Sequence, residues 1–277
     1  MRERFLGLEL AGAKNNKTAL SILEYYPREQ KIFLLDIRDR ISGDRGSARE
    51  HRPGISSGDQ ALLDLLIEPD EEITLLAVNV PLTLPPAFLD KKSEAAAVAW
   101  MGRFAKRAAV GHRASPIEFT AYTQRPVELW LRHEVLARVP RTAQFEVDEA
   151  LGGNRAPLTA RMHYLQRMLD PAKLVEALPK LTALRLCTQL GLDRRFLARY
   201  RRLEEGAHAR LGFLEELVAR RGVFIYERDL EKLSTSLTAF DSFLCAYTEL
   251  LSHRDGCERP PRGFPKSSGW VEFPKEE

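Results

Sequence analysis

Cysteine is scarce in this sequence, and the spacing of the few that occur argues against the usual cysteine-based architectures. The 277 residues contain three, Cys187, Cys245 and Cys257, which lie far apart and include no C-x-x-C pair. A disulfide framework or a thiolate zinc site needs paired or clustered cysteines. We therefore expect neither, and the cysteine usage favours a reducing compartment.

Long apolar runs are absent as well. No stretch approaches the roughly 18 apolar residues that a membrane-spanning helix requires. Arg2 and Arg4 precede an apolar run, as in a signal peptide, but the run is short and Glu9 interrupts it. A buried strand is the better interpretation of this segment. We predict a cytoplasmic protein.

Several catalytic signatures are also missing. The chain has no Walker-type phosphate loop, no G-x-S-x-G and no G-x-G-x-x-G sequence. Its six histidines show neither H-E-x-x-H nor H-x-x-x-H spacing, so no zinc site is predicted.

An excess of charge of one sign is lacking too. The 42 basic and 39 acidic residues give a formal net charge of +3, and the 44% hydrophobic and 29% charged content is that of an ordinary globular protein. A nucleic-acid partner would have to bind local clusters of basic side chains. Three such clusters occur: Arg103, Lys106, Arg107 and Arg113; Arg194, Arg195, Arg199, Arg201 and Arg202; and Arg259 with Arg262.

These basic clusters support two interpretations. At helical spacing they could line a groove and contact the phosphates of a nucleic acid. A run of charge is more often a solvated helix face, and Glu204 and Glu205 directly follow the second cluster. The sequence leaves both interpretations open.

The first part of the chain predicts an antiparallel meander. Apolar runs at Phe5–Leu10, Thr18–Tyr25 and Ile32–Ile37 are separated by turn-forming residues, which is the pattern of consecutive hairpins. A helix opening at 58–60 and a strand at Ile73–Val80 follow at the spacing of a βαβ unit, so that strand is expected to be parallel to its neighbour.

The remainder predicts further helices and short strands. Residues 87–170 are interpreted as a helical insertion or cap, Arg194–Arg221 as a strongly helical stretch and Leu237–Leu251 as a long amphipathic helix. Short strands are expected at Lys173–Leu178, Val223–Tyr226 and Gly269–Phe273. We predict an α/β fold with a mixed sheet, an antiparallel meander plus parallel strands, in a single domain over residues 1–277.

Two of the predicted strands end on polar side chains with oxygen atoms that can bind a metal. The run Phe5-Leu6-Gly7-Leu8 reaches Glu9, and the run Leu75-Leu76-Ala77-Val78 reaches Asn79. In open α/β sheets the loops at the carboxyl ends of the strands form the ligand-binding crevice. Both residues are therefore candidate site residues.

At this point the sequence resembles a known family, the predicted RNase H-like nucleases (domain-of-unknown-function family 429). The family pattern has G-x-D and D-x-P-L strand ends, an E-x-x-P-K segment, a late helix with D-x-x-x-C/A-A and a closing G-W-hydrophobic strand. The matching segments, in order, are Gly7-Leu8-Glu9, Asn79-Val80-Pro81-Leu82, Glu176-Ala177-Leu178-Pro179-Lys180, Asp241 to Cys245-Ala246, and Gly269-Trp270-Val271.

The resemblance implies an RNase H-like fold and a two-metal nuclease site. Enzymes of this fold hold two Mg²⁺ ions with hard oxygen ligands from separate strands and a late helix. The ligand positions map to Glu9, Asn79, Glu176 and Asp241, with Glu9, Glu176 and Asp241 as the metal ligands, Asn79 as a neutral fourth catalytic residue and Mg²⁺ or Mn²⁺ as the cofactor.

Two of these positions depart from the family. Glu9 stands in place of an aspartate and carries its carboxylate one bond further out; misplacing a catalytic group by about 1 Å can cost on the order of 10²-fold in rate. Asn79 keeps an oxygen but loses a charge. The departures predict weak metal binding and impaired hydrolysis.

Each candidate also has a structural alternative. Glu9 could pair with Lys14 or Lys17, and Asn79 could close a loop through an Asx-type turn. Glu176 could be an ion-pair partner in a short strand. Asp241 could cap a helix, in competition with Ser234 and Thr235. The residue types fit these structural roles as well as the metal-ligand interpretation.

Two functional hypotheses follow. The first is a metal-dependent nuclease, a phosphodiester hydrolase of RNase H-like fold with an impaired site. The second is a catalytically inactive RNase H-like module that binds nucleic acid or a protein partner. A nucleotide-binding relative of the actin-like ATPases shares this core, but the shortage of glycine-rich phosphate loops argues against it.

Overall fold

Six strands form one mixed sheet in the order β5-β4-β1-β2-β3-β6. The computed structural model describes residues 2–12, 17–41, 54–67, 74–110, 117–193 and 195–276, with the side chains of 107–110 left out. Strands β1, β2 and β3 pair antiparallel, whereas β4, β5 and β6 are parallel to their neighbours. This confirms the predicted α/β class with a meander plus parallel strands. The strands are β1 Glu3–Glu9, β2 Ala19–Tyr26, β3 Lys31–Arg38, β4 Leu75–Val78, β5 Leu174–Glu176 and β6 Val223–Phe224.

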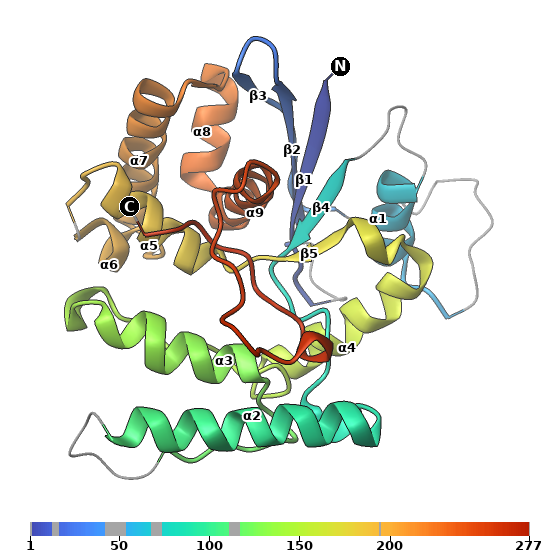
Figure 1. Ribbon diagram of the computed structural model, residues 1–277. Coiled ribbons are helices and arrows are strands. Elements are labelled where there is room, and N and C mark those ends of the chain that lie inside the picture. The colour runs from blue at the N-terminus through green and yellow to red at the C-terminus, as the bar shows by residue number, and fades with distance from the viewer. Residues whose placement is uncertain are drawn as a thin grey trace.

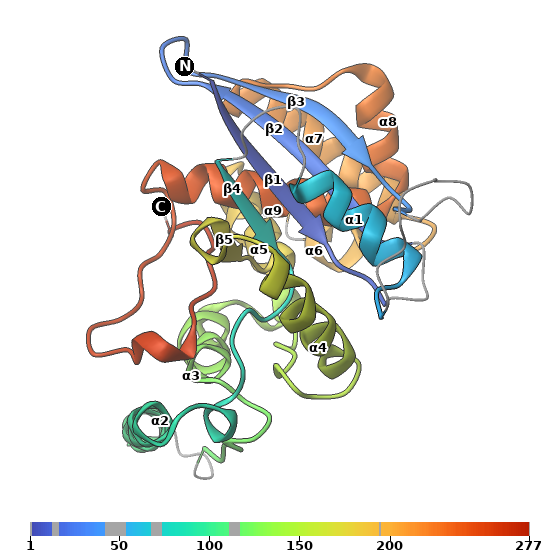
Figure 2. The ribbon, with the colours of Figure 1, turned by 90° about the vertical axis from the view of Figure 1, so that its right-hand side faces the viewer.

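Helices cover both faces of this sheet (Figures 1 and 2). One face is covered by α5 (Pro179–Gln189), α7 (Gly206–Arg221), α8 (Glu227–Thr235) and α9 (Leu237–His253), which share an apolar core with β1, β2 and β3. The other face is covered by α1 (Ser57–Ile67) and α4 (Arg155–Leu165), whose leucines form a second core. Because β1 is central in the sheet, Phe5 to Leu8 are buried whether they face one layer or the other.

Helix α9 lies unusually close to the sheet, and Gly7 is the reason. A Cβ atom added to Gly7 would lie 2.0 Å from the carbonyl oxygen of Ser242 and 2.2 Å from the backbone nitrogen of Ala246. The hydroxyls of Ser21 on β2 and Ser242 on α9 are also only 2.7 Å apart. Small residues on β1 and β2 therefore let the α9 backbone rest directly on the strands.

The helices α2 (Lys91–Val110) and α3 (Pro126–Trp130) lie beyond the carboxyl ends of the parallel strands (Figure 1). A single π-helical turn, Leu131–Val135, continues α3. Residues 87–170 contain several helices, as expected. Among the described residues, no helix is both long and apolar enough to cross a membrane. Short 3₁₀ turns occupy Pro86–Phe88, Leu136–Arg138, Arg141–Ala143, Gln166–Met168, Pro171–Lys173 and Lys266–Ser268.

Two secondary-structure predictions need correction. The expected helix over Arg194–Arg221 is two helices, α6 (Arg195–Arg199) and α7, because the chain turns back at 200–205 and the guanidinium of Arg210 binds the Tyr200 carbonyl there. The expected strand Gly269–Phe273 is only an isolated bridge, in which Glu272 pairs with Ala177 beyond the end of β5.

Candidate functional site

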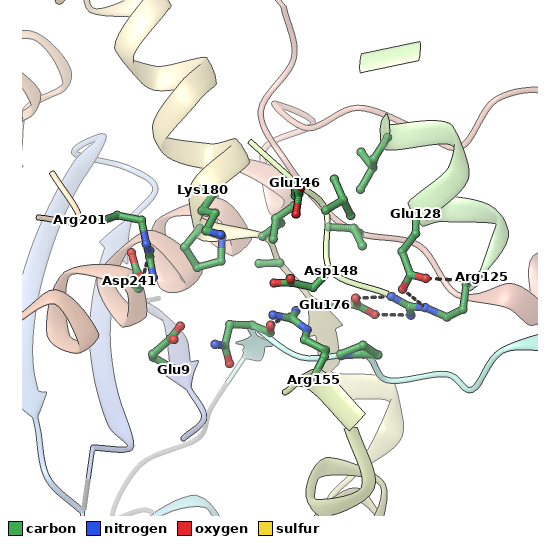
Figure 3. A pocket seen from close by; sticks show the side chains of 18 residues that line it. Glu9, Arg125, Glu128, Glu146, Asp148, Arg155, Glu176, Lys180, Arg201 and Asp241 are labelled. Atoms are coloured by element: carbon green, nitrogen blue, oxygen red, sulfur yellow. Dashed lines mark hydrogen bonds and ion pairs between the residues drawn. The ribbon is translucent and has the colours of Figure 1, made fainter. Parts of the chain in front are cut away.

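One pocket lies at the carboxyl ends of the parallel strands, and all four predicted site residues line it (Figure 3). Glu9 ends β1, Asn79 follows β4, Glu176 ends β5 and Asp241 belongs to α9. The cavity has a volume of about 60 Å³. The parallel pairing of β1, β4 and β5 brings these strand ends to one edge of the sheet.

The close approach of α9 to β1 places Asp241 beside Glu9. Gly7, two residues before Glu9, lies beneath Ser242, the residue after Asp241. Asp241 is inside the helix, since α9 begins at Leu237 and the side chain of Ser236 caps it by accepting from the Ala239 amide. The alternative that Asp241 caps the helix is therefore wrong.

Glu9 and Asp241 each keep one buried carboxylate oxygen without a hydrogen-bond partner, Oε2 of Glu9 and Oδ1 of Asp241. Burial, and secondly the charge of Asp241, together raise the pKa of Glu9 to about 8. Burial also raises the pKa of Asp241, although Arg201 counteracts this. The two carboxyl groups thus hinder each other's ionisation.

Arg201 forms an ion pair with the second carboxylate oxygen of Asp241, Oδ2. Its guanidinium lies 2.5 Å from Asp241 Oδ2. In the described residues Glu9 makes no comparable ion pair with Lys17, while Lys14 lies outside the described residues. Glu9 therefore has no ion-pair partner among the described residues, although the charges of Arg201, Arg155 and Lys180 act to lower its pKa.

Glu176 is held by an arginine that the sequence did not single out. The two terminal nitrogens of Arg125, Nη1 and Nη2, each donate to the Glu176 carboxylate at 2.7 Å. The Leu82 amide donates to Oε2 of the same carboxylate at 3.1 Å. Arg125 also donates to Glu128 at 2.9 Å. Burial lowers the pKa of Arg125, but the charges of Glu176 and Glu128 outweigh it and hold the pKa above its ordinary value. The ion-pair alternative for Glu176 is the one observed.

Asn79 ties two strand ends together. Its Oδ1 accepts from the Leu10 amide at 2.8 Å, and its backbone carbonyl accepts from the Arg155 guanidinium. The side chain thus bridges β1 and β4 and does not form the Asx-type turn within its own loop that was the alternative. The side-chain oxygen of Asn79 therefore already accepts a hydrogen bond.

The three predicted metal ligands share the pocket but do not converge. Among the described residues there is no group of three or more Asp, Glu, His or Cys side chains placed to hold one metal ion. Glu176 points toward Arg125, whereas Glu9 and Asp241 lie together on the opposite side of the pocket (Figure 3). The predicted metal ligands therefore fall into two groups: Glu9 with Asp241, which we call the acid pair, and Glu176, which is bound by Arg125.

Sequence reasoning missed much of the pocket lining. Arg125 precedes Pro126 and Glu128, and this arrangement is a recognisable helix start: proline at the first position and an acid at the third. Nothing local links it to Glu176, which lies 51 residues further on. The lining residues with charged side chains that were not predicted as site residues are Arg125, Glu128, Glu146, Asp148, Arg155, Lys180 and Arg201.

The described arginines of the second basic cluster, and Arg259 of the third, are ion-paired. Arg195 binds Asp193, and both Arg199 and Arg202 lie near Glu205. Arg259 binds Asp255 in the third cluster. Arg113 and Arg194 lie outside the described residues. This pattern favours solvated helix faces, with Arg201 as the member that enters the pocket.

No protein-family model, no curated protein and no solved structure matches the chain. Membership of the RNase H-like nuclease family therefore stays a prediction from the ordered motifs.

Proposed function

We propose that this protein is a metal-dependent phosphodiester hydrolase of RNase H-like fold whose site is reduced to one acid pair. The observation that carries the proposal is the pair of buried, unpartnered oxygens, Glu9 Oε2 and Asp241 Oδ1, at the carboxyl edge of the parallel strands. Buried polar atoms without partners are rare in folded proteins, and each calls for an explanation such as strain, a catalytic role, or a water or ion that it binds.

Two carboxylates are the donors available to a divalent cation, so we infer one cation and not two. Glu9 and Asp241 supply hard carboxylate oxygens, which Mg²⁺ and Mn²⁺ prefer. Glu176 and Asn79, the other two predicted positions, have their oxygens engaged by Arg125, Leu82 and Leu10. We therefore assign the metal-binding role to Glu9 and Asp241, and a positioning role to Glu176 and Asn79.

A cation held by this pair would polarise a phosphoryl oxygen and lower the pKa of a bound water. The chain's own residues prepare the pocket for that chemistry. Arg201 fixes the Asp241 carboxylate through Oδ2, and the Asn79 amide holds the ends of β1 and β4 at a fixed separation. Arg125 keeps Glu176 away from the acid pair and so limits the negative charge there.

Metal titration tests the proposal. Calorimetry with millimolar Mn²⁺ should show binding to the native protein, strongly reduced in Glu9→Gln and Asp241→Asn. Asp255→Asn is a matched control, because Asp255 is exposed and asparagine tolerates its positive φ of 57°. Hydrolysis of a simple aryl phosphodiester with Mn²⁺ should fall in the same two variants. Absence of any Mn²⁺ binding would contradict the proposal.

A second candidate is an inactive module of the same fold. The observation that favours it is that Arg201 and Arg125 already neutralise Asp241 and Glu176, so that built-in cations stand where metals are expected. This candidate predicts metal-independent binding of a single-stranded oligonucleotide that survives Glu9→Gln and Asp241→Asn. The combined variant Arg195→Gln, Arg199→Gln and Arg202→Gln should abolish that binding. Loss of oligonucleotide binding in the acid variants would count against it.

A further inference from the structure

We propose that Arg155 and Lys180 form a phosphate subsite in the pocket that also contains Glu9 and Asp241, and that this subsite selects a ligand with a terminal phosphate. This inference deepens the proposed function and rests on it for the chemistry, but the subsite itself binds without metal. Both side chains line the same cavity as Glu9 and Asp241 (Figure 3).

Arg155 carries a donor that lacks an acceptor. Its Nη2 donates to the Asn79 carbonyl, which fixes the guanidinium at the end of β4. Its Nε is buried and has no hydrogen-bond partner. A buried donor without an acceptor costs about 1–3 kcal/mol, and more when the group is charged. An oxygen of a bound anion would relieve that cost.

Lys180 supplies a second positive charge. It occupies the second position of α5, is half-buried, and makes no ion pair among the described residues. Its ammonium lies 5.7 Å from the centre of the Phe145 ring, a cation–π contact that leaves its hydrogen-bond donors available. The α5 N-terminus has no side-chain cap, so its partial positive charge adds to that of Lys180.

The other cations of the lining are already neutralised. Arg125 is bound by Glu176 and Glu128, and Arg201 is bound by Asp241. Two carboxylates of the lining, Glu146 and Asp148, are exposed, and solvent screens their repulsion of an incoming anion. Arg155 and Lys180 are therefore the groups in the described lining that can receive an anion.

The size of the cavity restricts the ligand. The volume of about 60 Å³ is of the order of one small group such as a phosphate, well below the roughly 300–1,000 Å³ of pockets that enclose a whole small molecule. Arginine suits this role because its planar fork matches the geometry of phosphate oxygens, and lysine adds a point charge. We infer a single terminal phosphate as the recognised group, carried by a nucleotide or by the end of a nucleic-acid strand.

Metal-free calorimetry with inorganic phosphate tests the subsite. The native protein should bind phosphate, and Arg155→Gln and Lys180→Met should each weaken binding at least tenfold. Arg220→Gln is the control, since Arg220 is exposed and paired with Glu216 on α7. Arg155→Lys keeps the charge and should retain part of the affinity, with circular dichroism confirming that each variant is folded. Equal phosphate affinity in all variants, or none in the native protein, would overturn the subsite.

A second experiment identifies which kind of molecule carries the recognised phosphate. An oligonucleotide with a 5′-phosphate should bind more tightly than the same strand without it, and Lys180→Met should remove the difference. If a mononucleotide binds and the phosphorylated strand does not, the ligand is a nucleotide; no preference for either phosphorylated compound contradicts the inference. Loss of Mn²⁺ binding with intact phosphate binding would reject only the proposed function, whereas the reverse result would reject only the subsite.

Discussion

Arg125 and Glu176 are joined by two parallel hydrogen bonds of 2.7 Å in the protein interior, where each side chain is almost completely buried. The pair connects α3 to the end of β5 and so fixes the helical segment against the sheet edge that forms the pocket. It also decides which acids remain available, because a carboxylate held by both guanidinium nitrogens has few free lone pairs.

We predict that Arg125→Met destabilises the protein by about 3–5 kcal/mol, because it leaves the Glu176 and Glu128 carboxylates buried without their cation. Urea denaturation measures this. Arg138→Met is the control; Arg138 pairs with Glu134 on the surface, and exposed pairs contribute about 0–1 kcal/mol. Similar effects of the two substitutions would show that the buried pair does not hold α3 in place.

Gly7→Ala should severely destabilise the fold. Its Cβ would lie 2.0 Å from the Ser242 carbonyl oxygen, and the α9 backbone would have to move away from β1. Gly102→Ala is the matched control, since Gly102 lies within α2 with nothing within 4 Å of a new Cβ. That change should stabilise by roughly 0.5–1 kcal/mol. The melting temperatures of the two variants should shift in opposite directions from that of the native protein. An unchanged melting temperature in Gly7→Ala would disprove the close approach of α9 to β1.

Glu249 should make stability depend on pH. Burial raises its pKa to about 8, with the charge of Glu272 as the second cause, against an ordinary value of 4.5. Between these values the folded state holds a proton that the unfolded state has lost, so stability falls as pH rises from about 5 to 8. The slope contributed is at most about 1.4 kcal/mol per pH unit.

The variant Glu249→Gln should reduce this dependence, leaving the part contributed by Glu9, whose pKa is also raised to about 8, and should be more stable than the native protein at about pH 8.5. Denaturation midpoints measured across the pH range provide the comparison. Glu215→Gln, an exposed change on α7, should leave the native profile in place. A steep native-like decline in Glu249→Gln would assign the effect to other groups.

Arg201→Met should increase the affinity for Mn²⁺ if the acid pair is the metal site. Removal of the guanidinium frees Asp241 Oδ2, which then becomes available to a cation. We expect about a tenfold gain, equivalent to about 1.4 kcal/mol, together with lower stability of the metal-free protein. Calorimetry and thermal melts with and without Mn²⁺ measure both effects. An unchanged affinity would indicate that Arg201 does not compete with the metal.

Local patterns in the sequence were sufficient for the six strands of the sheet and for the placement of Glu9 and Asn79, although Gly269–Phe273 was wrongly predicted as a further strand. The runs around Phe5–Leu10 and Leu75–Val78 are apolar over the length of a strand, and parallel pairing necessarily brings their carboxyl ends to one edge. Local patterns were insufficient for α6 and α7, where a helical composition concealed the turn at 200–205. There the tertiary bond from Arg210 to Tyr200 decides the break.

The sequence by itself determined the mixed α/β sheet and placed Glu9 and Asn79 at the carboxyl ends of its strands, because apolar periodicity and chain order carry that information. Glu176 and Asp241 became candidates only through the resemblance to the RNase H-like family. Only the tertiary structure decided which of these side chains keep a carboxylate oxygen without a hydrogen-bond partner. Arg125 binds Glu176 across 51 positions of sequence, and α9 reaches Glu9 only because Gly7 lacks a side chain. Ion pairing depends on distance in space, and no local pattern of residues specifies that distance.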